Sequence, residues 1–132
     1  MKVGIVGLGL IGGSFAKAYH AAGWEVLAAD IDRSMLEFAM LQGAVNGELT
    51  EAALADCDLI LIAVYPRAAV EFLEQHGEKI GKKPVVIDCC GTKRVVCAAC
   101  FPLAKRYGFT YLGGHPMAGT HNSGFKYATA TM

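Results

Sequence analysis

The 132-residue sequence has no long hydrophobic run and no excess of charge of either sign. No unbroken apolar stretch is longer than that at residues 59–65, which is far shorter than the ~20 residues that a membrane-spanning helix needs. Twelve basic and twelve acidic side chains cancel, and no basic run alternates with aromatic residues. We therefore expect no membrane and no nucleic-acid partner, and a cytoplasmic location.

Cysteine is present, but its pattern does not require disulfides. The five cysteines are Cys57, Cys89, Cys90, Cys97 and Cys100. The last two have the C-x-x-C spacing of a zinc or redox pair, which is the alternative interpretation. They lie in a segment rich in valine and alanine that is typical of a helix, where free cysteine behaves as a small buried hydrophobe. We interpret all five as reduced thiols and predict no metal site.

The most informative stretch lies near the N-terminus, where an apolar run at residues 3–6 leads into the glycine pattern Gly7-x-Gly9-x-x-Gly12. In a strand–turn–helix unit the first glycine permits the tight turn, the second lets a pyrophosphate approach the backbone, and the third lets helix and strand pack closely. The free N–H groups of the first helical turn then face the phosphates. The predicted dinucleotide-binding residues here are Gly7, Gly9, Leu10, Ile11 and Gly12.

A second apolar run, residues 26–29, ends at Asp30, eighteen positions after Gly12. An acid at about this distance accepts hydrogen bonds from the adenosine ribose in dinucleotide folds, so we expect Asp30 to do so here. Its charge would repel a 2′-phosphate and therefore favours NAD, whereas the nearby Arg33 leaves NADP as an alternative. A signal peptide is the other explanation of the N-terminal apolar run, but the dense glycines and the following strand and acid argue against it.

Three further apolar runs predict strands at residues 59–64, 85–87 and 110–112, and helical patterns separate them. Strands that alternate with helices predict an α/β fold with a doubly wound parallel sheet, the Rossmann arrangement. We expect residues 1–132 to form one dinucleotide-binding domain. High hydrophobic content, 54%, fits a sheet that is buried on both faces.

Local signals place the helices. Ser34-x-x-Glu37 has the pattern of a capping box, and Thr92 is a reasonable N-cap for a later helix. Pro102 is predicted to interrupt or kink that helix. His76 is interpreted as a surface histidine near a helix end.

The loop after the strand at residues 59–64 also belongs to the predicted site. Because it leaves the carboxyl end of a strand, its residues Val64, Tyr65 and Pro66 are expected to border the cofactor, close to the nicotinamide. Pro66 is placed where the next helix can begin.

His115 is the strongest candidate for chemistry. It lies between Gly113-Gly114 and Pro116, directly after the last predicted strand, and should share one sheet edge with the glycine turn. An imidazole can take a proton from a hydroxyl while hydride leaves for a nicotinamide. A structural loop histidine is the alternative at this point.

Residues 7–14 together with Gly-Gly-His-Pro-Met-Ala-Gly-Thr at 113–120 and Ser123-Gly124 resemble the prephenate dehydrogenase family, over essentially the whole chain. The resemblance implies a nucleotide-binding domain and NAD-linked oxidative decarboxylation of prephenate to 4-hydroxyphenylpyruvate in tyrosine biosynthesis. It implies that His115 binds and deprotonates the substrate hydroxyl, and we assign Gly119 and Thr120 to the substrate. Arogenate dehydrogenase shares the motifs and is the alternative.

The chain departs from this family at identifiable places. Relatives often have Asp-x-x-Ser-x-Lys where this chain has residues 88–93, and Gly91 stands at the serine position, so we hypothesise that Thr92 or a water replaces that serine. Relatives often carry an acid where this chain has His121. The family also adds a helical domain that forms a homodimer and supplies arginines for the substrate carboxylates. This chain is expected to be truncated before that domain, and on its own it could be a catalytically silent NAD-binding module.

Overall fold

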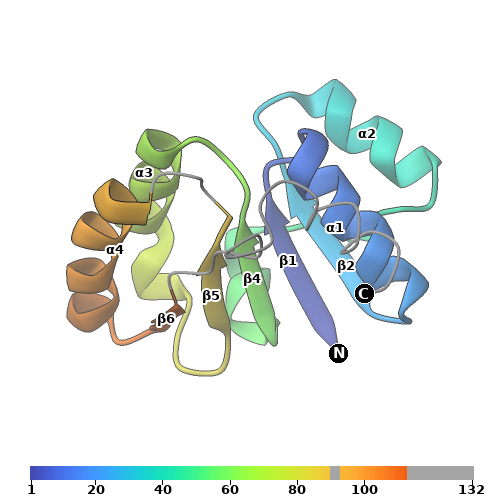
Figure 1. Cartoon of the computed structure of the whole chain (residues 1–132). Coiled ribbons are helices and arrows are strands. Elements are labelled where there is room, and N and C mark those ends of the chain that lie inside the picture. Colours follow the sequence, from blue (N-terminus) through green and yellow to red (C-terminus); the bar gives the residue numbers. More distant parts are fainter. Residues whose placement is uncertain (90–92, 113–132) are drawn as a thin grey trace.

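The computed structural model describes residues 1–89 and 93–112, which build a parallel six-stranded sheet in the order β3-β2-β1-β4-β5-β6 (Figure 1). All five neighbouring strand pairs are parallel. The strands are β1 (Lys2–Val6), β2 (Glu25–Ala29), β3 (Gly47–Glu48), β4 (Leu59–Ile62), β5 (Val85–Asp88) and β6 (Thr110–Leu112). This is the strand order of a doubly wound dinucleotide-binding sheet, so the predicted fold class is confirmed.

Helices connect successive strands and cover both faces of the sheet. The helices are α1 (Leu10–Ala21), α2 (Arg33–Leu41), α3 (Pro66–His76) and α4 (Lys93–Tyr107), and the short 3-10 turns are η1 (Glu51–Asp56) and η2 (Gly77–Lys79). Figure 1 shows α1 and α2 together on one side of the sheet and α3 and α4 together on the other. The change of side occurs between β1 and β4.

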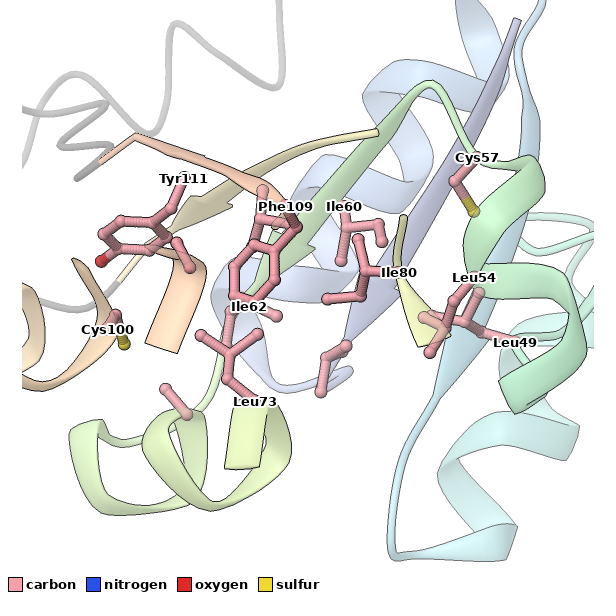
Figure 2. Packing of buried hydrophobic residues seen from close by; sticks show 14 of the residues in the cluster. Leu49, Leu54, Cys57, Ile60, Ile62, Leu73, Ile80, Cys100, Phe109 and Tyr111 are labelled. Carbon is pink, nitrogen blue, oxygen red and sulfur yellow. The ribbon is translucent and has the colours of Figure 1, made fainter. Parts of the chain in front are cut away.

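The buried side chains form two clusters because successive residues of each strand point to opposite faces. Val3 and Ile5 of β1 pack with Phe15 of α1 and Leu36 of α2. The second cluster, on the other face, joins the β4 side chain of Ile62 and its strand neighbours to α3 and α4, as Figure 2 shows. A fully buried side chain of this size contributes roughly 1.5–3 kcal/mol to the stability of the fold, so the two clusters fix both layers of helices on the sheet.

The structure differs from the sequence-based predictions at three local points: the predicted N-cap of α2 and the predicted interruption at Pro102 were wrong, and one strand was missed. Asp32, not Ser34, is the N-cap of α2, and its side chain accepts a hydrogen bond from the Ser34 N–H at 3.0 Å. Helix α4 continues through Pro102 to Tyr107 without the predicted interruption. The two-residue strand β3 was not predicted, because Gly47 and Glu48 show no apolar pattern and are held by pairing with β2.

The cysteine side chains that the structure describes are buried, which was predicted for Cys100. Cys57, Cys89 and Cys100 are all buried. Burial raises the pKa of the Cys57 thiol to about 11, so this thiol stays protonated at neutral pH. Cys90 and the side chain of Cys97 lie outside the described residues. Within the described part of the chain, no group of three or more metal-binding side chains occurs.

A membrane-spanning helix was not expected from the sequence. Among residues 1–89 and 93–112, no helix is both long and apolar enough to cross a bilayer.

Candidate nucleotide-binding site

The candidate site lies at the carboxyl edge of the sheet, where β1 and β4 are neighbours. From β1 the chain turns into α1 on one face, and from β4 it turns into α3 on the other face (Figure 1). The connections therefore diverge at this edge, and such a point is where open α/β sheets bind their ligands. The glycine turn and Asp30 follow directly after β1 and β2, and Val64 is the second residue after β4.

Two glycines of the turn are required by the fold itself. Gly7 has a φ of +98°, and its N–H donates to the Ala29 carbonyl at 2.8 Å. A Cβ on Gly7 would lie 2.6 Å from the Ala63 carbonyl oxygen, and a Cβ on Gly12 would lie 1.8 Å from the Gly7 carbonyl oxygen. These contacts agree with the tasks predicted for the first and third glycine, since no side chain fits at either position.

Gly9 differs, because nothing in the described fold requires glycine there. A Cβ at this position would meet no atom within 4 Å, and the φ of −66° suits any residue. Gly9 is the N-cap of α1, and as a glycine it has no side chain that could cap the helix. The first turn of α1 also contains no acidic residue. The first N–H groups of a helix have no acceptor within the helix. The backbone at Gly9, Leu10 and Ile11 therefore offers donors beside open space.

Asp30 does more than was predicted from the sequence. Its Oδ2 accepts a hydrogen bond from the Leu8 N–H at 2.7 Å, and its Oδ1 accepts one from the Asp32 N–H at 2.9 Å. The hydrogen bond from Leu8 links the glycine turn to Asp30 at the end of β2. A carboxylate has about four lone-pair sites, so both oxygens keep capacity for hydroxyl donors.

A cavity of about 380 Å³ adjoins Asp30, within the size range of small-molecule sites. Its lining residues are Val6, Gly7, Ala29, Asp30, Ile31, Glu48, Val64, Ala68, Glu71, Phe72, Gln75 and His76. Of the predicted loop residues, Val64 lines this cavity. Tyr65 is the N-cap of α3 with 86% of its surface exposed, and Pro66 is the first residue of α3; neither lines it.

An arginine–glutamate ion pair and a histidine–glutamate contact, each between segments far apart in the sequence, flank the cavity, and sequence reasoning missed both. Arg33 Nη1 donates to Glu48 Oε2 at 2.9 Å. His76 Nδ1 lies 2.8 Å from Glu51 Oε2, and the imidazole packs against the Phe72 ring with the ring centres 4.8 Å apart. His76 is thus half-buried and part of the cavity wall, rather than a plain surface residue. Each pair joins segments far apart in the sequence, so local patterns carry no signal of it.

The other end of the sheet edge holds a buried carboxylate. Asp88, the last residue of β5, is 1% exposed, and its Oδ2 accepts a short hydrogen bond from the Tyr111 hydroxyl of β6. The strands β5 and β6 end here, and the residues that were predicted to take part in catalysis or substrate binding follow them in the sequence. Those residues, namely Thr92, His115, Gly119 and Thr120, lie outside the described part of the chain.

Comparison with known proteins decides the family. The family model "Prephenate dehydrogenase, nucleotide-binding domain" matches residues 15–132. The chain belongs to this family. The prephenate dehydrogenase of Lactococcus lactis is 34% identical over 127 residues, which cover 93% of this chain and 36% of the relative. The prephenate dehydrogenase of Bacillus subtilis is 32% identical over 126 residues, which cover 91% of this chain and 33% of the relative.

Solved structures agree with this membership. The prephenate dehydrogenase of Aquifex aeolicus, in complex with hydroxyphenyl propionate and NAD+, has a TM-score of 0.73 at 28% identity and covers 96% of this chain. This chain covers 45% of that structure and about a third of the length of the curated relatives. The resemblance drawn from residues 7–14 and 113–120 is therefore confirmed at the level of the nucleotide-binding domain.

Proposed function

We propose that this chain is the NAD+-binding part of an enzyme that oxidatively decarboxylates prephenate to 4-hydroxyphenylpyruvate in tyrosine biosynthesis. The observation that carries the proposal is the open space at Gly9. Nothing in residues 1–89 and 93–112 requires glycine there, yet a side chain would occupy the space in front of the uncapped first turn of α1. A pyrophosphate that approaches the backbone closely gives a reason for the glycine.

The neighbouring residues fit the rest of an NAD+ molecule. N–H groups at Leu10 and Ile11 would donate to the phosphates, and Asp30 would accept from the ribose hydroxyls while it keeps its bonds to the turn. The cavity beside Asp30, with Val64 and Phe72 on its walls, would hold the adenine. This assigns Val64 to the adenosine end, whereas the sequence suggested the nicotinamide end. Bound NAD+ supplies a hydride acceptor.

His115 is proposed as the general base for the substrate hydroxyl, because it comes three residues after β6 in the sequence and β6 ends at the same sheet edge. Thr92, or a water, would position His115, and Gly119 and Thr120 would contact the substrate. In the longer enzyme, His115→Asn should lower turnover by roughly 100- to 10,000-fold with little effect on NAD+ affinity. Unchanged turnover would remove His115 from this role, and unchanged turnover of Thr92→Val would do the same for the threonine.

A second substrate has specific support. The arogenate dehydrogenase of Synechocystis has a TM-score of 0.74 at 26% identity, and the match covers 88% of this chain and 41% of that structure. Arogenate carries an amine where prephenate has a keto group. NADH formation with prephenate, with arogenate and without substrate separates the two dehydrogenases from a catalytically silent NAD+-binding module.

The longer curated relatives also support a proposal about what accompanies this chain. We expect a helical domain after residue 132 that forms a homodimer and binds the substrate carboxylates through arginines, since bidentate arginine pairs recognise carboxylates well. Molecular mass in solution, compared between the 132-residue chain and the protein of the full gene, tests the dimer. A monomer in both forms would contradict it.

A further inference from the structure

The wall of the cavity beside Asp30 is negatively charged. Three carboxylates line it, those of Asp30, Glu48 and Glu71, and no lysine or arginine is among its described lining residues. Such a wall accepts neutral ribose hydroxyls and repels a phosphate dianion. The charge at the end of β2 therefore bears on the choice between NAD+ and NADP+, which differ only by a 2′-phosphate on this ribose.

Arg33 is the cation closest in sequence to Asp30, three positions further on, and it is the first residue of α2. An arginine near the end of the second strand is the group that accommodates a 2′-phosphate in dinucleotide folds. In this chain, however, its guanidinium Nη1 donates to Glu48 Oε2 at 2.9 Å. The arginine that would favour NADP+ is thus already engaged by a carboxylate.

The position of Glu48 is set by the short strand β3. Glu48 pairs in parallel register with Ala28 of β2, and the Leu49 N–H donates to the Ala28 carbonyl at 2.7 Å. The pairing places Glu48 beside the end of β2, where it both lines the cavity and reaches Arg33. No other described carboxylate makes an ion pair with Arg33.

We propose that Glu48 is a cofactor-specificity residue: it neutralises Arg33 and adds a negative charge to the ribose end of the cavity, so that the site selects NAD+ over NADP+. The inference depends on the proposed function, since it assumes that this cavity takes the adenosine end of the cofactor. The side chains of Arg33 and Glu48 are 61% and 45% exposed. Because both side chains are exposed, the ion pair is weak and can open. The preference for NAD+ over NADP+ that it gives is therefore partial.

The test uses calorimetric titration of the 132-residue chain with NAD+ and with NADP+ at low ionic strength, where charge effects are least screened. Glu48→Gln keeps the size of the side chain and removes its charge. We expect the Kd for NADP+ to fall about three- to fivefold, the worth of an exposed ion pair, while the Kd for NAD+ stays the same. Adding Arg33→Gln to this variant should remove most of the gain and leave only the part that comes from the lost negative charge.

Glu71→Gln is the matched control for charge alone. Glu71 lines the same cavity but approaches Arg67, at 4.0 Å, instead of Arg33. A smaller gain in NADP+ affinity than with Glu48→Gln supports the release of Arg33, and an equal gain overturns it. Equal melting temperatures of the variants show that the fold is kept.

The outcomes separate the two proposals. If the wild-type chain binds NAD+ and Glu48→Gln leaves the ratio of the two Kd values unchanged, the role of Glu48 is refuted and NAD+ binding stands. If the wild-type chain binds neither nucleotide, the proposed function and the role of Glu48 both fail.

Discussion

Replacing Gly9 by alanine separates binding from folding better than any other single change in the glycine turn. The added Cβ would meet no atom within 4 Å, and the backbone at φ −66° and ψ −163° is open to alanine. The cost to the fold is limited to the weaker N-cap, about 0.5–1 kcal/mol, because alanine caps helices less well than glycine. For a chain of this size we expect the melting temperature to fall by about 4 °C or less.

The cost to binding should be much larger. The Cβ would stand between the first N–H groups of α1 and a pyrophosphate. Each charge-assisted hydrogen bond lost is worth about 1.5–3 kcal/mol, so we expect NAD+ affinity to fall by about 10- to 100-fold. Calorimetric titration with NAD+ measures the affinity, and fluorescence of Trp24, the only tryptophan, follows unfolding.

Gly13→Ala is the matched control, since it adds the same methyl group one turn further into α1. The nearest atom to its Cβ would be the Leu8 carbonyl oxygen at 3.7 Å, an ordinary contact. Helix propensity predicts a gain of up to about 1 kcal/mol in stability, with unchanged NAD+ affinity. If Gly9→Ala binds NAD+ as tightly as the wild type does, the phosphates do not approach this turn and the assignment of the site is refuted.

Three further predictions concern stability. Gly12→Ala, whose Cβ would lie 1.8 Å from the Gly7 carbonyl oxygen, should cost about 4 kcal/mol or more and abolish cooperative urea unfolding; a wild-type transition would contradict the geometry of the turn. Tyr111→Phe removes the hydroxyl that donates to Asp88 and should lower the free energy of unfolding by about 1–3 kcal/mol, whereas no change would show that the bond is energetically neutral. Because burial raises the pKa of Cys57 from 9.0 to about 11, the unfolded thiol ionises first, and stability should fall by about 2–3 kcal/mol between pH 9 and pH 11. Cys57→Ala should remove that part of the pH dependence in urea unfolding; an identical slope in both proteins would mean that the thiol does not contribute.

Much of the sheet could be predicted from the sequence, because strands of a parallel sheet that are buried on both faces appear as continuous apolar runs. The runs at residues 26–29 and 59–64 became β2 and β4 in this way. Strand β3 could not be predicted, since it exists only through its hydrogen bonds to β2. The N-cap of α2 was misplaced because Asp32 and Ser34 both suit that position, and only the coordinates show which side chain bonds to the backbone.

The geometry of the candidate site was predictable where it depends on the local sequence. Gly7, Gly12 and Asp30 lie where their spacing placed them, and two of the glycines show the expected close contacts. The charges around the cavity were not predictable. The pairing of Arg33 with Glu48 joins residues fifteen positions apart through the strand pairing of β2 and β3, and no spacing rule applies to it.

The central claim is that NAD+ binds at the sheet edge where β1 and β4 meet. Amide chemical shifts of the isotopically labelled 132-residue chain, recorded as NAD+ is added, test it most directly. We predict saturable shifts that are largest at Gly9, Leu10, Asp30 and Val64. The absence of shifts, or shifts confined to residues between α1 and α2 that lie away from the glycine turn, such as Phe38 and Gln42, would contradict the account.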